Sequence, residues 1–161
     1  MDLLGKTSCN HIVGIPPVAY ILDTCPRCLR LGEYGGVAYD TGGKVQTITG
    51  VFQIEQQIRK ILTENIRSSG YGFDYSLLRG VIDSPTISVI KNEVVRCITY
   101  LYNLQQQSKK EGFNYRPDEE ISSIQSVDAY QSTTEPRTVV VALIVLTVSG
   151  AQASVTLSLK R

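Results

Sequence analysis

The sequence has little net charge, a single histidine and no long apolar run. Lys and Arg number 16 against 15 Asp and Glu, so the net charge is +1 and no basic stripe marks a nucleic-acid surface. The longest apolar stretch, Val139 to Leu146, is far too short to cross a bilayer as a helix. The segment Met1 to Ser8 lacks the apolar core of a secretory signal. We therefore expect a protein of the cytoplasm, or of a particle assembled there, with neither nucleic acid nor membrane as a partner.

Residues suited to catalysis are scarce. The single histidine, His11, lies near three cysteines, so a Ser-His-Asp triad is not credible. A glycosidase needs two facing carboxyl groups, one of which has a raised pKa in an apolar pocket. Glu55 and Glu64 are expected on the polar face of a short helix, and the acidic run Asp118–Glu120 is expected to be exposed. We expect no enzymatic activity, and a lysozyme-type glycosidase is the most distant alternative.

Three of the four cysteines gather near the start of the chain. Cys25 and Cys28 enclose a Cys-Pro-x-Cys turn, a spacing that lets two thiolates face one zinc ion. Cys9 and His11 could supply the other two ligands of a tetrahedral site, although Cys-x-His is an unusual spacing. A short segment rich in Gly and Pro otherwise has little to stabilise it. The sequence thus predicts a structural zinc site at Cys9, His11, Cys25 and Cys28 in a loop-rich extension of residues 1 to 44.

Other interpretations of these residues stay open. Cys25 and Cys28 could be free thiols in a surface loop, with His11 solvated. A disulfide between Cys9 and Cys25 is conceivable, but nothing else in the sequence is typical of a secreted protein. A redox Cys-x-x-Cys is disfavoured because no βαβ pattern surrounds it. Cys97 lies on the apolar face of an expected helix, which favours a buried core thiol.

Two amphipathic helices are expected in the middle of the chain. The first should run from about Val51 to about Asn65, because apolar residues recur at helical spacing. A short helix or turn is expected around Tyr75 to Gly80. The second helix should start with Ser84 as N-cap and Pro85 at its first position, and end near Gln107.

The last part of the chain should form a sheet. Ile121 to Tyr130 is expected to be one strand, and the uncharged run Thr138 to Val148 suits a strand covered on both faces. Ala153 to Leu159 alternates apolar and polar residues, so it should pair with the preceding run as a hairpin. The expected fold is α+β, with two helices packed on a small, mainly antiparallel sheet over residues 45 to 161.

Several motifs, read together over residues 50 to 160, resemble one protein family. These are Ile58-x-x-Ile61-Leu62-Thr63 at the end of the first helix, Tyr75-x-x-Leu78 in the following loop, and Glu135-Pro136-Arg137 before a strand. In this order they resemble the baseplate wedge and sheath-initiator family of contractile phage tails, known as the lysozyme-like baseplate wedge family. The Cys25–Cys28 motif followed by Gly32 and Tyr34 resembles an extension found in some such proteins. The family's usual turn after the first helix is replaced here by Thr63–Arg67, so its contacts are not carried over.

The resemblance implies a structural role in the virion. It implies contacts with other baseplate wedge proteins and with the tail sheath protein, and hub or tube proteins are further candidate partners. Main-chain pairing at a sheet edge is a suitable mode of contact, because it supplies affinity without sequence-specific chemistry. The segment from Ala153 to Leu159 lacks the lysine or proline that usually protects an exposed edge, which suggests a partner strand along Val155, Leu157 and Leu159.

Glu135, Pro136 and Arg137 form the other expected interface. If the segment is extended, Glu135 and Arg137 lie on the same side of it, with Pro136 fixing the backbone between them. The family resemblance favours a role in contacting a partner or fixing the strand entrance. A solvated surface pair of little energetic value is the alternative. The competing function for the whole chain is a zinc-dependent adaptor that recognises its partner through the cysteine-rich extension.

Overall fold

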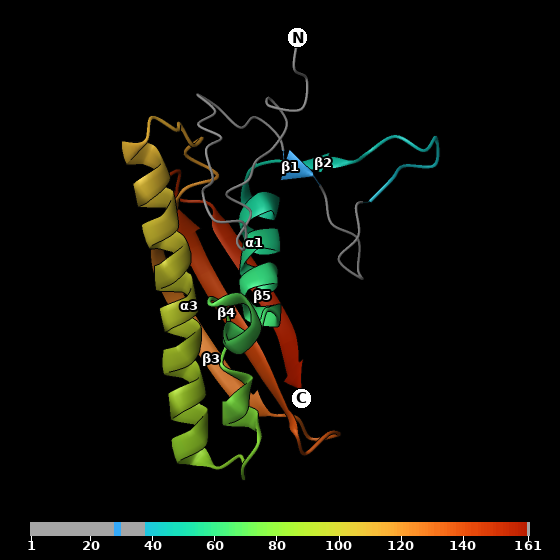
Figure 1. Ribbon diagram of the computed structural model, residues 1–161, viewed down its shortest axis with the longest axis vertical. Helices are drawn as coiled ribbons and strands as arrows, with labels where there is room; N and C mark the ends of the chain where they lie inside the picture. Colours follow the sequence, from blue (N-terminus) through green and yellow to red (C-terminus); the bar gives the residue numbers. More distant parts are fainter. Residues whose placement is uncertain (1–27, 30–37, 161) are drawn as a thin grey trace.

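The computed structural model describes residues 28–29 and 38–160. Its centre is a three-stranded antiparallel sheet (Figure 1) made of β3 (Ile121–Gln131), β4 (Thr138–Thr147) and β5 (Gln152–Lys160). The strand order is β3-β4-β5, so β4 is central and β5 lies at one edge. The expected α+β class and antiparallel sheet are therefore confirmed, together with the C-terminal hairpin.

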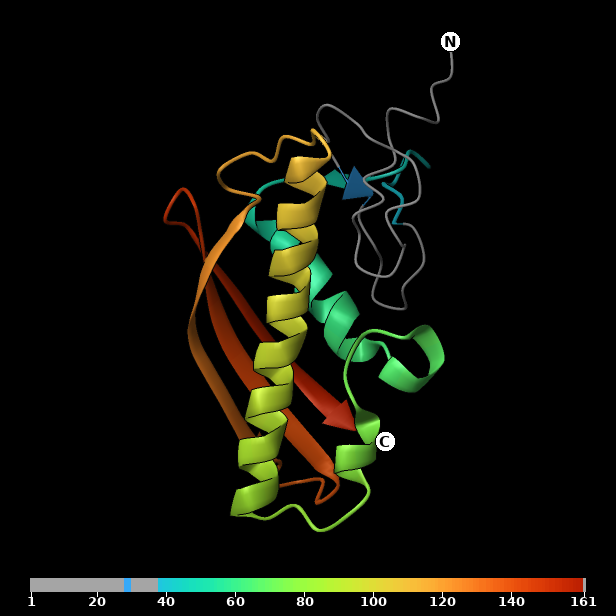
Figure 2. The same cartoon turned by 60° about the vertical axis from the view of Figure 1, so that its left-hand side comes forward.

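Two helices cover one face of this sheet (Figures 1 and 2). They are α1 (Val51–Thr63), which packs on β5, and α3 (Ser84–Lys110), which packs on β3. Between them lie a one-turn helix, α2 (Ile66–Ser69), and a 3-10 turn, η1 (Tyr75–Leu78). Two-residue strands β1 (Cys28–Leu29) and β2 (Thr47–Ile48) pair separately. The sequence predicted the two long helices and the turn near Tyr75, but it did not predict α2.

The start of α3 differs by one residue from the expectation. Asp83, and not Ser84, is the N-cap: its carboxylate accepts a hydrogen bond from the Thr86 N–H at 2.9 Å. Pro85 then stands within the first turn, where a missing N–H costs nothing. The hydrogen bonds that the Thr86 N–H and hydroxyl donate to the Asp83 carboxylate lower the pKa of Asp83, because they favour its charged form. A carboxylate is also the better partner for the positive end of a helix.

Alternation along the strands defines the core. Every second residue of β4 faces the helices and is almost fully buried, as are three residues of β5 and the apolar stripes of α1 and α3. Cys97 of α3 is among these buried side chains, as expected, and burial raises its pKa to about 12. Its thiol is therefore a packing group at neutral pH.

The opposite face of the sheet is not covered by any helix in the described part of the chain. Its central row is apolar and partly exposed: Val140, Ala142, Ile144 and Leu146. On β5 these residues pair with Ser158, Thr156, Ser154 and Gln152, in that order. Residues 28–29 and 38–160 thus cover β4 with helices on one face, and the cover expected on its other face is left to a partner protein. Within the same residues, no helix is both long and apolar enough to cross a membrane.

Candidate functional site

The Glu135–Arg137 segment forms a turn and is not extended. The Thr138 N–H donates to the Glu135 carbonyl oxygen at 2.9 Å, which places Pro136 and Arg137 at the centre of a four-residue turn. All three residues are exposed at the tip of the β3–β4 connection. Because the backbone reverses here, the prediction that Glu135 and Arg137 share one side of an extended segment is wrong.

The Glu135 carboxylate faces residues other than Arg137. It accepts a hydrogen bond from the Thr138 hydroxyl at 2.7 Å, and the Lys160 ammonium lies 3.9 Å away. Lys160 ends β5, so this exposed ion pair joins the turn to the end of the edge strand. An exposed pair of this kind contributes little stability. The Arg137 side chain makes no hydrogen bond or ion pair with the rest of the described chain, so it stays available for a contact.

The apolar side chains of β5 lie inside the molecule. Val155 and Leu159 are fully buried, and Leu157 is partly buried. They pack under α1 as part of the core, and only Leu157 keeps some exposed apolar surface. The part of the expected interface that remains open to a partner is the backbone along the outer edge of β5.

Two side chains of α1 hydrogen-bond to that outer edge. The Ser154 N–H donates to the Glu55 carboxylate at 3.1 Å, and the Arg59 guanidinium donates to the Thr156 carbonyl oxygen at 3.1 Å. We call Glu55 and Arg59 the edge pair. Glu55 takes the place of the carbonyl oxygen that a neighbouring strand would offer to Ser154. Arg59 takes the place of the N–H that such a strand would offer to Thr156. The outer edge of β5, which was expected to be unprotected, is therefore partly occupied by these two side chains of α1.

The spacing of the edge pair follows from the geometry of helix and strand. The two elements run in the same direction (Figure 1), so residues of α1 and β5 advance together. Four helical residues rise about 6 Å, and two strand residues advance about 6.6 Å. An i, i+4 pair on α1 thus matches an i, i+2 pair on β5. Glu55 and Arg59 immediately follow the buried residues Ile54 and Ile58, which positions them at the flank of the helix.

The protection ends at Thr156. The next residue in the same row of α1 is Thr63, whose hydroxyl turns back to the Arg59 and Lys60 carbonyl oxygens at 2.9 and 3.0 Å. Along β5 the N–H and C=O groups of successive residues point alternately toward β4 and away from it. Those of Ser158 point away from β4, like those of Ser154 and Thr156. In the described chain no group bonds to the Ser158 N–H, so the second half of the β5 edge remains open.

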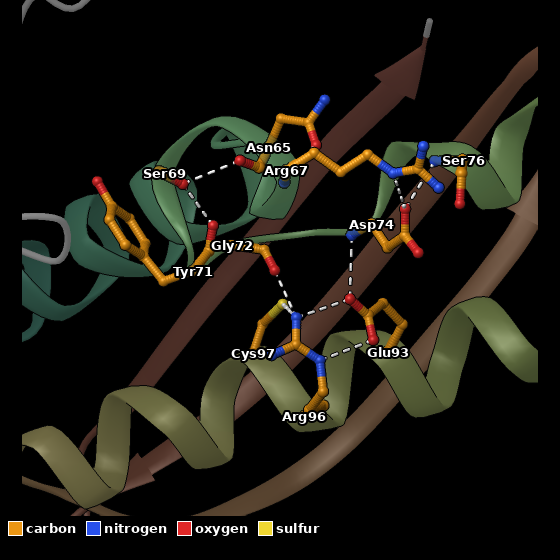
Figure 3. Close-up of polar contacts among 10 residues, drawn as sticks. All are labelled: Asn65, Arg67, Ser69, Tyr71, Gly72, Asp74, Ser76, Glu93, Arg96 and Cys97. Atoms are coloured by element: carbon orange, nitrogen blue, oxygen red, sulfur yellow. Dashed lines mark hydrogen bonds and ion pairs between the residues drawn. The ribbon is translucent and has the colours of Figure 1, made fainter.

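A second polar cluster fixes the connection between α1 and α3 (Figure 3). Arg96 of α3 forms a two-pronged ion pair with Glu93, at 2.8 and 2.7 Å, and donates to the Gly72 carbonyl oxygen. Glu93 also accepts from the Asp74 N–H at 3.0 Å. The bonds to Glu93 raise the pKa of Arg96. This cluster attaches the loop to α3 and has a structural role, because each group in it is bonded within the chain.

The residues that carry the family resemblance lie around this loop. Ile58, Ile61 and Leu62 are fully buried core residues of α1. The Tyr75 hydroxyl donates to the Leu62 carbonyl oxygen at 2.9 Å, and Leu78 is a buried core residue. These residues thus determine how the loop returns from α1 to α3.

One acidic residue is placed differently from the expectation. Glu119 is 2% exposed, so the expectation that it belongs to an exposed acidic run is wrong. Its carboxylate accepts from the Gly50 N–H at 3.0 Å, at the start of α1. Burial raises the pKa of Glu119, and the bond from Gly50 opposes that shift. The side chain joins the β3 entrance to α1, so we interpret it as structural.

The predicted zinc ligands Cys9, His11 and Cys25 lie outside the described residues. Of Cys28 only the backbone is described, as part of β1 paired with β2. Among residues 28–29 and 38–160 no cluster of three or more candidate metal ligands occurs. The zinc site therefore stays a prediction.

The helical pattern alone does not reveal the role of Glu55 and Arg59 at the edge of β5. From the sequence both are expected on the solvent face of the first helix, as ordinary charged residues. A signal was present in their spacing, since oppositely charged residues four apart beside an apolar stripe can reach the same neighbouring element. Identifying that element required the packing of α1 on β5, two segments almost a hundred residues apart.

The chain matches no family model and no curated protein.

Proposed function

We propose that this chain is a structural component of a contractile phage tail baseplate, which joins wedge subunits and nucleates the tail sheath by strand addition. The observation that carries the proposal is the open half of the β5 edge, at Ser158 and beyond. A short antiparallel sheet with one face covered by helices and one edge strand unpaired can accept a strand from another chain. The motifs that resemble the sheath-initiator family support the assignment to that kind of assembly.

The turn at Glu135–Arg137 provides a second contact in this proposal. Its residues are exposed and lie beside Lys160, at the end of β5. A partner strand that pairs with this end of β5 would reach the Arg137 guanidinium, which can bind a carboxylate through two parallel hydrogen bonds. The turn would then fix the register of the added strand. No catalytic step is part of the proposal, and its site of action is the assembled virion.

A proline at the open edge tests strand addition. Ser158→Pro removes an N–H that faces away from β4, so the hairpin should persist, because proline is tolerated on edge strands at such positions. We expect a folded variant that fails to nucleate sheath when tail particles are assembled from the phage that encodes this chain. Sheathed and unsheathed tails are counted by electron microscopy. Ser158→Ala keeps the N–H and is the matched control.

Normal sheaths on particles that contain the Ser158→Pro protein would contradict strand addition at β5. Absence of the wild-type chain from baseplates, assessed by antibody labelling of purified tails, would contradict the baseplate assignment itself.

A further inference from the structure

The edge pair, Glu55 and Arg59, occupies backbone atoms of β5 that a partner strand would need. In the described chain the outward groups of β5 are bonded only at Ser154 and Thr156, and both bonds come from charged side chains of α1. Glu55 is partly buried and Arg59 is exposed, and the two atoms they contact belong to the backbone of β5. A strand that paired along the whole of β5 would need the same two backbone atoms. The edge pair and a full-length partner strand therefore compete for one site.

We propose that Glu55 and Arg59 form a displaceable latch on the β5 edge. In the free chain the latch occupies the Ser154–Thr156 half and limits pairing to the short segment beyond it. An incoming strand pairs first at Ser158 and Lys160, then displaces Arg59 from Thr156 and finally Glu55 from Ser154. The proposal rests on the proposed function in one respect, which is that β5 accepts a strand at all.

The latch protects the β5 edge from incorrect pairing. An edge strand with unpaired N–H and C=O groups pairs readily with other chains, and natural proteins protect such edges with charged side chains. The two bonds are exposed, so each adds little stability and can be exchanged for main-chain bonds of a partner. Bonds of this strength suppress weak pairing of β5 with other copies of the chain. A partner that contributes a complete strand can still displace them.

The order of displacement follows from where the row of side chains ends. Thr63 bonds to its own helix, so the outward groups beyond Thr156, at Ser158 and Lys160, have no bond from the described chain. At the other end of β5 only Gln152 is likewise without one, and Ser154, which the Glu55 carboxylate holds, follows it directly. Pairing that starts at Ser158 gains bonds before it must break any. Pairing that starts at Ser154 would first lose the bond to the Glu55 carboxylate.

The test uses a fluorescent peptide with the sequence of β5 itself, Ala153–Lys160, as an edge-binding probe. Its binding is measured by anisotropy to the wild-type chain and to the Glu55→Ala/Arg59→Ala variant, which keeps the net charge. Loss of two competing hydrogen bonds should tighten binding by about tenfold. The variant Glu55→Gln/Arg59→Lys keeps an acceptor and a donor at the same positions, so its affinity should stay close to that of the wild type.

Two controls separate the latch from general effects. Lys91→Ala/Asp128→Ala removes an exposed ion pair of 3.2 Å that joins α3 to the opposite edge strand, β3, and it should leave binding unchanged. Ser158→Pro added to the Ala variant should abolish binding, because it blocks the end where pairing begins. Circular dichroism is used to check that each variant is folded.

The outcomes distinguish the latch from the proposed function. Equal binding by the wild type and the Ala variant, blocked in both by Ser158→Pro, would overturn the latch and leave strand addition intact. Weaker binding by the Ala variant would show that Glu55 and Arg59 help to bind the strand, which also overturns the latch. Failure of every folded variant to bind would overturn both the latch and strand addition at β5.

Discussion

Gly72 lies so close to Glu64 that a Cβ atom on Gly72 would overlap the Glu64 carbonyl oxygen. The two residues meet because the Phe73 N–H donates to that same carbonyl oxygen at 2.9 Å, which closes the loop between α1 and α3. Gly72 also has a φ of 99°, a region that other residues rarely adopt. The loop therefore requires glycine at this position for two independent reasons.

Gly72→Ala should lower the free energy of unfolding by at least about 2 kcal/mol, because it combines an unfavourable φ with a backbone overlap. Urea unfolding followed by circular dichroism measures the change. Gly70→Ala is the matched control: Gly70 has a φ of 76°, but a Cβ there meets nothing within 4 Å. Equal losses for the two variants would show that φ alone, and not the approach to Glu64, determines the effect.

The burial of Leu159 predicts a large effect on stability. Leu159→Ala should lower the free energy of unfolding by about 2 to 5 kcal/mol, because it leaves a cavity under α1. The same urea titration measures it, with the exposed neighbour Ser158→Ala as the control within about 0.5 kcal/mol of the wild type. A small loss at Leu159 would mean that its side chain does not pack in the core.

The pKa of Glu119 predicts a pH dependence. Because burial raises this pKa above its value of 4.5 in the unfolded chain, the folded protein binds the proton more tightly. The resulting stabilisation is complete below the unfolded pKa and is lost as the pH rises through the folded pKa. Glu119→Gln keeps an acceptor for the Gly50 N–H and does not titrate. The melting temperature of Glu119→Gln minus that of the wild type should therefore increase as the pH is raised from about 4 to about 7.

Thermal melts at several pH values, recorded by circular dichroism, measure this difference. Groups that are common to both proteins cancel when the two melting temperatures are subtracted. A difference that stays constant across the range would contradict a raised pKa at Glu119.

Removing the Arg137 guanidinium should leave folding unchanged and impair assembly into baseplate wedges. Because its side chain is exposed and makes no hydrogen bond or ion pair in the described chain, Arg137→Ala should melt at the wild-type temperature and yet fail to join baseplate wedges. Arg79→Ala is the matched control, since Arg79 is also exposed and lies elsewhere, after η1. Assembly is followed by co-sedimentation with wedge particles. Normal incorporation of the Arg137→Ala protein would remove the proposed role of the turn.

The cysteine motif predicts about one zinc ion per chain. Metal analysis of the purified protein should find it, and Cys25→Ser/Cys28→Ser should lose it, while Cys97→Ala, which changes a core residue, should not. A wild-type chain that folds without zinc would contradict the site.

Deletion of residues 1 to 44 then separates the two candidate functions. A baseplate component should keep its fold and its partners from residue 45 onward, whereas a zinc-dependent adaptor should lose binding altogether. Co-sedimentation of the shortened chain with wedge particles provides the readout.

Local patterns in the sequence were sufficient to predict most elements. The spacing of Ile54, Ile58 and Ile61 indicated the first helix, and the alternation after Gly150 indicated the last strand, because each pattern reports directly on which side chains are buried. The N-cap of α3 was misplaced by one residue, since Asp83 and Ser84 are both good caps and only the bond to Thr86 decides between them.

Features that depend on packing between distant segments were missed. Glu119 belongs to an acidic run that would be solvated in isolation, and in the fold it is bonded to Gly50 at the start of α1 and to Gln105 of α3. The positions of Glu55 and Arg59 likewise depend on β5. The turn at Glu135 was misjudged because a tripeptide that contains proline suits both an extended segment and a turn.

The contact between Arg59 and Thr156 also bears on how the chain reaches this fold. The two residues are 97 positions apart in sequence, and α1 has its main partner strand in β5, the last strand of the sheet. The hydrophobic face of α1 thus stays without its strand until nearly all of the sheet has been synthesised. Proteins dominated by such distant contacts fold slowly, in milliseconds to seconds. Until that time the apolar face of α1 lacks the strand that covers it in the native fold, and transiently exposed apolar surface of this kind promotes aggregation.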